Sequence, residues 1–395
     1  MRTSEKRVLT THVGSLPRPK KLADLLIARD HGRKVNEKAL FREVEAATDW
    51  VVKKQIESGI DIGNDGEEAR VGFQTYVINR MSGWGGTSKR KLPTDMTVFP
   101  KYADMFTQRI WSTESERPRV WNAPQAVTAV KYEPDLKDVK FEMGIFADSL
   151  KRSRKKFAET FVTAASPGIV TTTMLRAAKN PAYKTDRDYV LAVAKELKGE
   201  YEYIVKQGHI LQIDAPDLAM ERQFMYQGRP LKEFLKRVEL HIQAMNIALA
   251  NIPASKARLH VCWGNWDGPH IDDVELEPLL PLLYEAKVGA LSIACANPRH
   301  QHDWHAIKNN PPPKSMVLIP GLIDVTTNYL EHPIAIADRI CKFVEVMGDR
   351  DRVIAGADCG FSTFANYVMV AEDVVWAKLK MLSEGAAIAT KRLYS

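Results

Sequence analysis

The chain has 395 residues, of which 45% are hydrophobic and 27% charged, a balance typical of a globular protein with a sizeable core. No apolar run reaches the roughly 18 residues of a membrane span, and the N-terminus lacks the apolar stretch of a secretory signal. The formal charge of +7 is spread among acidic residues, so we expect no nucleic-acid binding. These features predict a cytoplasmic protein with reduced cysteines, and the positive charge would favour a small anionic substrate.

Short apolar runs rich in β-formers alternate with longer helical stretches along the chain. The candidate strands are residues 10–14, 60–64, 119–122, 169–175, 210–214, 258–263, 290–294, 317–323 and 353–358. Between them lie segments such as residues 189–207, where apolar side chains recur close to the 3.6-residue period of a helix. Alternation of strand and helix predicts a parallel sheet joined by crossover connections.

The pattern favours an α/β fold, a single-domain (β/α)8 TIM barrel over residues 1–395. Nine candidate strands exceed the eight that a barrel needs, and residues 119–122 are the weakest of them. A doubly wound sheet is the alternative, but no strand end carries its typical GxGxxG turn. Reactive residues instead follow several strands, as they do at the C-terminal mouth of barrel enzymes. They are Asp214, His260, Cys262, Asn297, Asp324, Asp358 and Cys359.

A candidate metal site combines His260 and Cys262, two residues apart on a predicted strand, with Cys359 about a hundred residues later. Residues i and i+2 of a strand point to the same side, so His260 and Cys262 can share one ion. Cys359 follows the last strand and would close the set, because the first and last strands of a barrel are neighbours. Zinc takes such ligands tetrahedrally and keeps one position open when catalytic. Ordinary packing of a buried histidine and two buried cysteines is the alternative.

Two acidic motifs also follow predicted strands. Asp214 ends the run before Pro216 and would face the barrel mouth, where it can bind an amine or a hydroxyl; alternatively it caps the next helix. Glu67 belongs to the segment Asp65–Arg70 (DGEEAR), whose paired carboxylates suit acid/base chemistry. The alternative for this segment is the first turn of a helix, where the macrodipole favours acidic residues.

Residues 297–305 hold three histidines, His300, His302 and His305. His302 and His305 are expected on a helix and His300 just before it, an arrangement that argues against an independent metal site. The fork of donors on Arg299, together with His300, would instead hold a carboxylate or a sulfonate.

Taken together, these segments resemble the cobalamin-independent methionine synthase family, specifically its catalytic C-terminal barrel and the shorter single-barrel relatives. The matching segments, in the family's order, are residues 10–19 (TTHVGSLPRP), 65–67 (DGE), 211–214 (LQID), 260–262 (HVC) and 358–360 (DCG). The resemblance covers nearly the whole chain. It implies that His260, Cys262 and Cys359 bind Zn2+, which activates a substrate thiol as a thiolate. It also implies that Gly14, Ser15, Glu67 and Asp214 position the polar end of that thiol.

Some positions depart from the family. Ala294 stands where a glutamate is a further zinc ligand, and strand alternation would point the adjacent Cys295 the other way. Ala215 and Met220 replace acidic residues, and the tryptophan on which folate stacks has no equivalent in residues 173–178. Homocysteine and methyl-folate are therefore not the expected substrates. Residues 263–270, 297–300 and 326–333 are more similar to the single-barrel relatives, a group that resembles the epoxyalkane:coenzyme M transferases.

The predicted function is that of a zinc-dependent alkyl- or methyltransferase that acts on a small thiol and a methyl or alkyl donor. A homo-oligomer is compatible with this prediction. His300, His332 and Asp324 are candidates for proton transfer or for orienting the electrophile. Two alternatives remain, a barrel without metal that acts as a binding protein, and a lyase that uses only acid/base residues. The loss of a ligand at Ala294 motivates the first of them.

Overall fold

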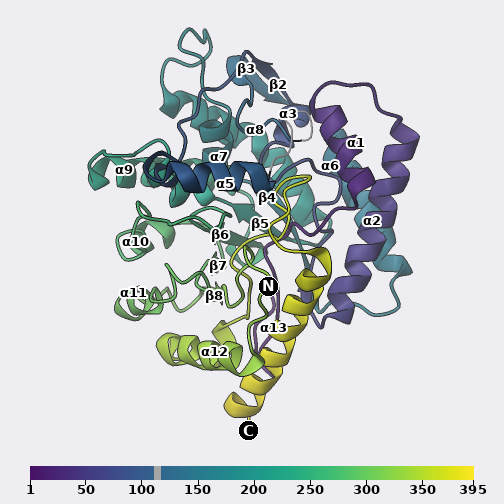
Figure 1. Ribbon diagram of the computed structural model, residues 1–395, viewed down its shortest axis with the longest axis vertical. Helices are drawn as coiled ribbons and strands as arrows, with labels where there is room; N and C mark the ends of the chain where they lie inside the picture. Colours follow the sequence, from purple (N-terminus) through teal and green to yellow (C-terminus); the bar gives the residue numbers. More distant parts are fainter. Residues whose placement is uncertain (111–116) are drawn as a thin grey trace.

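The computed structural model describes residues 1–110 and 117–395 and has a curled, parallel sheet at its centre (Figure 1). Six strands pair in parallel in the order β1-β4-β5-β6-β7-β8. Their bounds are β1 Ile62–Gly63, β4 Glu159–Ala165, β5 Ile210–Asp214, β6 Ala257–Val261, β7 Ala290–Ile293 and β8 Val317–Pro320. The strands β4 to β8 are buried almost throughout, as expected of a parallel sheet covered on both faces.

Isolated parallel bridges close this sheet into a barrel. Residues 353–356 pair with β8 through Leu318 and Gly321, and Ala355 pairs with Thr10. Thr11 then pairs with Ile62 of β1. The two remaining strand positions of the barrel are therefore taken by residues 10–11 and 353–356. This arrangement confirms the predicted (β/α)8 barrel and excludes the doubly wound sheet.

Two of the nine strand predictions were wrong. Residues 119–122 form a turn, and residues 169–175 lie mostly in the helix α7 (Pro167–Thr173), while the stave is β4, ten residues earlier. The run Ile-Val-Thr-Thr-Thr is β-branched and therefore resembles a strand. However, the Ser166 hydroxyl accepts the Ile169 N–H and Pro167 occupies the first turn, and together they begin a helix there.

Helices surround the barrel, and the expected helix over residues 189–207 is α8. The bounds are α1 Lys20–Asp30, α2 Glu37–Glu57, α3 Val77–Arg80, α4 Thr94–Val98, α5 Pro100–Ile110, α6 Lys137–Arg152, α8 Asp186–Lys206, α9 Leu231–Ala248, α10 Leu280–Leu283, α11 Trp304–Asn309, α12 Pro333–Met347 and α13 Glu372–Leu393. In the part of the chain that the structure describes, none of them has the length and apolar character to cross a membrane.

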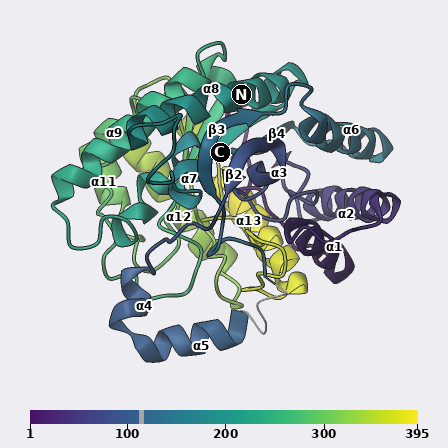
Figure 2. The ribbon, with the colours of Figure 1, turned by 90° about the horizontal axis from the view of Figure 1, so that it is seen from above.

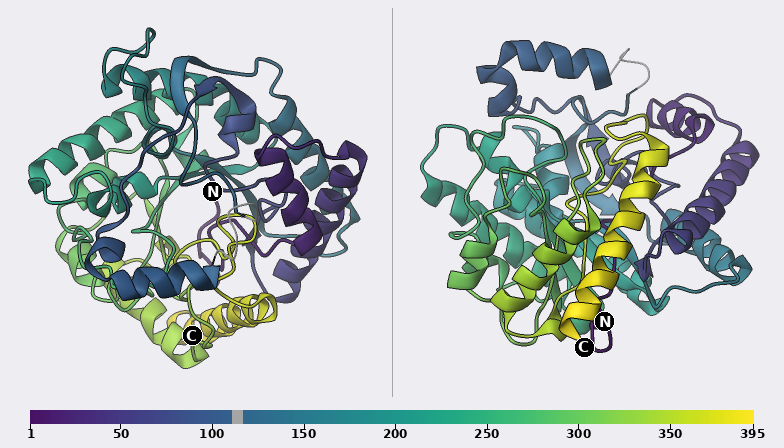
Figure 3. Two further views of the ribbon diagram at one scale, coloured as in Figure 1. Left: turned by 45° about the horizontal axis from the view of Figure 1, so that its top comes forward. Right: turned by 60° about the horizontal axis from the view of Figure 1, so that its bottom comes forward.

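Two insertions lie outside the barrel wall. An antiparallel pair, β2 (Met81–Gly85) with β3 (Gln125–Tyr132), packs against α8. Between these two strands in the sequence, α4 and α5 lie across one end of the barrel (Figures 2 and 3). Met96 of α4 and Phe106 of α5 line the same cavity as residues that follow the strands, so these two helices form a roof over the C-terminal mouth.

Candidate functional site

The residues predicted to hold a metal converge at the barrel mouth. His260 is the last residue but one of β6, Cys262 directly follows that strand, and Cys359 comes after residues 353–356; all three are buried. Their ligand atoms lie within 4.8 Å of one another, and the two Sγ atoms are 3.9 Å apart. Two sulfurs bound tetrahedrally to zinc at about 2.3 Å would be separated by about 3.8 Å. The spacing therefore fits one zinc ion.

The reason for this convergence differs from the predicted one. Residues 353–356 are separated from β6 by β7 and β8, so the two barrel strands that carry the metal-site residues are not neighbours. Cys359 reaches the site because the chain turns inward over the barrel mouth after residues 353–356. There Cys359 lies close to the C-terminal end of β6.

The orientation of His260 also fits a metal ligand. Its Nδ1 lies 3.3 Å from the Ser292 hydroxyl on β7, and its buried Nε2 has no hydrogen-bond partner among the described residues. A ligating histidine commonly binds the metal with one ring nitrogen and is oriented by a hydrogen bond at the other. The hydrogen bond between the two thiols lowers the pKa of Cys262 well below its ordinary value and, with burial, raises the pKa of Cys359 well above its own, so this contact favours a thiolate at Cys262 beside a thiol at Cys359.

Cys295 does not replace the missing ligand at Ala294. Its backbone N–H donates to Asp358 Oδ1 at 2.8 Å, and its thiol is outside the cluster that the described residues form at His260, Cys262 and Cys359. Burial raises the pKa of the Cys295 thiol well above its ordinary value. Cys295 is therefore a neutral core residue, as strand alternation predicts.

Asp214 faces the cavity from the end of β5 rather than capping a helix. The following 3-10 turn, η2 (Pro216–Leu218), begins after Ala215 and has no side-chain cap. Gln212 Nε2 donates to Asp214 Oδ1 at 2.7 Å, and Arg258 Nε donates to Gln212 Oε1 at 2.7 Å. Burial raises the pKa of Asp214 to about 7. The side chain is thus fixed in place beneath the metal ligands and open to a substrate donor.

Glu67 lies in the same cavity, in a turn and not in a helix. Its φ of 59° is held by the fold, and Thr163 Oγ1 donates to its Oε1 at 2.9 Å. A Cβ on Gly14 would come within 2.7 Å of Glu67 Oε1 and 2.6 Å of Thr163 Cγ2, so only glycine fits there. Ser15 lines the cavity beside it. The fold therefore brings together Gly14, Ser15 and Glu67, which were predicted to bind the substrate.

Four other predicted residues lie outside this cavity. His332 is exposed and caps α12 by accepting the Ile334 N–H, and Arg299 is exposed as well. Asp324 Oδ1 accepts the N–H groups of Thr326 and Thr327, which fixes a turn. His300 is buried, and together with Asp324 it lines a smaller, adjoining pocket that Cys262 and Cys359 also line. His300, His332 and Asp324 were predicted to transfer a proton or to orient the electrophile, and Arg299 to hold an anion; the polar contacts of His332 and Asp324 lie within their own loops, and those of His300 reach a second loop.

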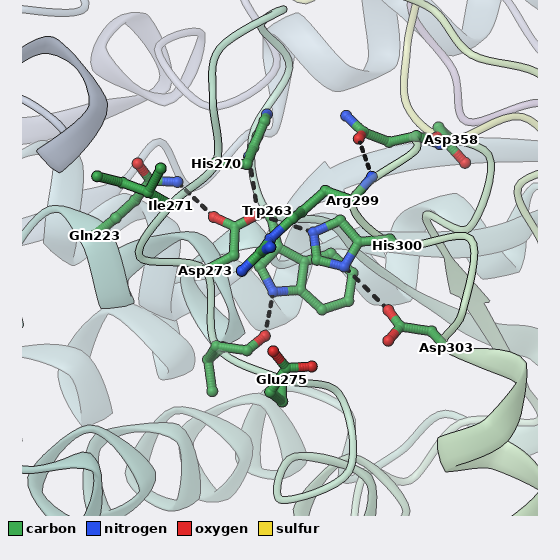
Figure 4. A network of polar contacts seen from close by, with 12 residues as sticks. Gln223, Trp263, His270, Ile271, Asp273, Glu275, Arg299, His300, Asp303 and Asp358 are labelled. Carbon is green, nitrogen blue, oxygen red and sulfur yellow. Dashed lines mark hydrogen bonds and ion pairs between the residues drawn. The ribbon is translucent and has the colours of Figure 1, made fainter. Parts of the chain in front are cut away.

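His300 belongs to a network of polar contacts that joins two loops (Figure 4). Its Nε2 lies 2.8 Å from Asp273 and its Nδ1 3.0 Å from Asp303, while Asp273 also pairs with His270 at 2.8 Å. Its ring stacks on Trp263 at 3.8 Å. Burial alone would lower the pKa of His300, but the hydrogen bonds and charges of the two aspartates outweigh it and raise the pKa to about 9. His300 is therefore a positively charged structural residue at neutral pH.

This network predicts a loss of stability in mild alkali. Because the pKa of His300 rises from 6.5 to about 9 on folding, its contribution is complete below pH 6.5 and is lost as the pH rises through 9. We expect the free energy of unfolding to fall by about 2 kcal/mol between pH 7 and 9. Urea unfolding at several pH values measures this. The His300→Gln variant should lose the slope and the exposed His305→Gln variant should keep it; an unchanged slope in His300→Gln would contradict the assignment.

Sequence reasoning missed the walls and roof of the cavity. They are mainly apolar and aromatic, and include Phe73, Met96, Phe106, Trp121, Met220, Phe224, Trp266 and Phe364. Asp95 of α4 holds the roof to the barrel, since its Oδ2 accepts Trp266 Nε1 at 3.2 Å and the His270 N–H at 2.8 Å. These residues come from separate loops without a shared motif, so only the folded chain brings them together.

Known proteins similar to this chain include methionine synthases and a 2-hydroxypropyl-CoM lyase, and no protein-family model matches it. A methionine synthase of Sulfolobus acidocaldarius is 24% identical over 390 residues, or 97% of this chain and 93% of that protein. A 2-hydroxypropyl-CoM lyase of Xanthobacter autotrophicus is 27% identical over 237 residues, 53% of this chain, and the match spans only 57% of that protein. The structure of a B12-independent methionine synthase from a Shewanella species, in complex with selenomethionine, has a TM-score of 0.69 at 21% identity, covering 98% of this chain and 99% of that chain.

Proposed function

Because the chain belongs to the cobalamin-independent methionine synthase family, we propose that it is a zinc-dependent alkyl- or methyltransferase acting on a small thiol. The observation that carries the proposal is the buried cluster of His260, Cys262 and Cys359, with two sulfurs at zinc-ligand spacing and an unpartnered imidazole nitrogen among the described residues. These three residues would hold the ion. When bound, the ion would supply a positive charge that lowers the pKa of a nearby substrate thiol and so favours its nucleophilic thiolate form.

The residues around the cluster would bind and orient the thiol. Asp214 and Glu67 present carboxylate oxygens, and Glu67 Oε2 has no donor within the described part of the chain. Ser15 adds a hydroxyl from the first loop. Together these groups suit a thiol with an amine or hydroxyl at its other end. The roof formed by α4 and α5 would exclude water while the alkyl group is transferred.

Metal analysis tests this function. Protein purified without added zinc should contain about one zinc per chain, and a strong chelator should remove both the ion and any thiol alkylation, with recovery on adding zinc back. Alkylation that persists in the metal-free chain would instead favour the acid/base lyase or another metal-independent activity. A chain that binds no zinc even after reconstitution would favour the binding-protein alternative.

A further inference from the structure

The cavity above the proposed metal site offers no free positive charge to a ligand. Of the described residues that line it, Arg90 is the only lysine or arginine. Its Nη2 is paired with Glu221, and these two side chains are 4% and 0% exposed. The guanidinium of Arg90 also lies 4.8 Å from the centre of the Phe224 ring. Arg299, which was predicted to bind an anion, lies outside the cavity. An anionic substrate, as the net charge suggested, would thus find no counter-ion here.

Several residues that line the cavity have buried polar atoms without a partner among the described residues; two are nitrogens, Arg90 Nε and His260 Nε2, and the others are oxygens. Glu67 Oε2, Gln74 Oε1 and Asn265 Oδ1 are buried, and none receives a hydrogen bond from the residues placed in the structure. Asp214 adds a second carboxylate on the cavity floor. The charge of a zinc ion would be balanced by the thiolates of Cys262 and Cys359, and Glu67 and Asp214 are the acidic side chains that remain on the lining. Such a lining favours a positively charged ligand.

Several aromatic rings line the cavity and meet one another at different angles. Trp121 and Phe224 stack at 6.3 Å between ring centres, and Trp266 meets Phe224 edge to face at 5.9 Å. On the other side, Phe73 and Phe364 are tilted against each other at 5.8 Å. Aromatic faces around an enclosed space bind quaternary ammonium and related cations through their ring quadrupoles.

We propose that the alkyl donor is an onium cation, a sulfonium or a quaternary ammonium compound, bound among these aromatic rings. This inference rests on the proposed function. The thiolate sulfur would attack one carbon of the onium group and form the S–C bond with its electron pair. The bond from that carbon to the onium sulfur or nitrogen breaks, its electrons stay on that atom, and a neutral thioether or amine leaves.

The aromatic cavity suits this reaction for two physical reasons. An anion and a cation become two neutral molecules, so charge separation is lost in the transition state, which a low-dielectric cavity favours. A neutral leaving group also needs no proton. The phenol of Tyr367 also lines the cavity, and its hydroxyl donates to the backbone oxygen of Asn265.

Calorimetric titration of the zinc-loaded protein with ligands of similar shape tests the charge preference. The probes are tetramethylammonium and trimethylsulfonium as cations, neopentyl alcohol as the neutral analogue and pivalate as the anion. We expect each cation to bind about tenfold more tightly than neopentyl alcohol, and pivalate to show no saturable binding. Equal binding of neopentyl alcohol, or tighter binding of pivalate, would overturn the proposal.

Variants locate the binding site. Trp121→Leu keeps an apolar side chain but removes a ring, and it should reduce the affinity for the cations to the affinity for neopentyl alcohol. Trp304 lies outside the cavity, so Trp304→Leu should leave the affinities for the cations and for neopentyl alcohol unchanged. Glu67→Gln should weaken only the cations. A cation preference that survives both cavity substitutions would place the binding elsewhere.

Transfer to a small dithiol, followed by mass spectrometry, then separates the two classes of donor. Methylation of the thiol by trimethylsulfonium alone, or by tetramethylammonium alone, identifies the class, and methylation by neither overturns the donor assignment. Zinc content is measured in the same samples. Absence of zinc would refute the proposed function, whereas a zinc-loaded protein without cation preference would refute only this inference.

Discussion

Replacing Cys359 by serine is expected to weaken zinc binding by more than about 100-fold, since loss of a residue that merely orients a ligand already costs 10- to 100-fold. Serine has nearly the shape of cysteine, but its hydroxyl stays protonated and is a poor ligand for zinc. The Sγ of Cys359 lies 3.9 Å from that of Cys262, so its loss leaves only one sulfur and one imidazole. Competition with a chelating dye measures the affinity.

The matched control is Cys341→Ser. Cys341 is a half-buried cysteine of α12 and is not among the clustered ligands found in residues 1–110 and 117–395. This variant should bind zinc as the parent does. Parental affinity in Cys359→Ser would place the metal elsewhere, and equal loss in both variants would point to general unfolding.

Replacing Glu142 by glutamine is expected to lower the free energy of unfolding by about 3–5 kcal/mol, the usual cost of leaving buried charges without a partner. Glu142 of α6 accepts from Arg70 Nη2 at 3.0 Å and is paired with Arg80, and all three side chains are buried. Burial alone would raise the pKa of Glu142, but the charges of the two arginines outweigh it and hold the pKa at about 2. The neutral amide would leave Arg70 without a counter-charge.

This change should also reach the candidate site. Arg70 Nη1 donates to Thr163 Oγ1 at 2.9 Å, and that hydroxyl in turn donates to Glu67. Urea unfolding measures the stability, with Glu345→Gln as control, because Glu345 pairs with Lys342 in solvent and its loss should leave the midpoint unchanged. An unfolding midpoint equal to that of the parent would show that the buried network contributes no net stability.

The barrel could be predicted from the sequence because its staves are short apolar runs, each followed by polar residues. The error at residues 169–175 arose because β-branched residues resemble a strand, whereas one serine cap and one proline decide the local structure. The metal cluster could be predicted because two of its residues share one strand end and because the family motifs match. The contacts of His300 and His332 could not be predicted, since Asp273 lies far from His300 in the sequence and the helix cap of His332 is a matter of local backbone geometry.

The cavity walls show the same limit. The rings of Trp121, Phe224 and Trp266 pack together, although Trp121 and Trp266 are more than a hundred residues apart in the sequence. Nothing in the local sequence of the three residues marks them as neighbours. Only the crossing of α4 and α5 over the mouth, together with the loops after the strands, makes one surface of them.

The central claim is that His260, Cys262 and Cys359 hold a metal ion with a position open to a thiol. Titration of the cobalt-substituted protein with a small thiol tests it most directly, because cobalt reports its sulfur ligands through charge-transfer absorption. We predict thiolate absorption from the protein alone, a further increase that saturates at one thiol per chain, and release of about one proton for each thiol bound. A cobalt spectrum without sulfur ligands, or one that does not respond to any thiol, would contradict the account.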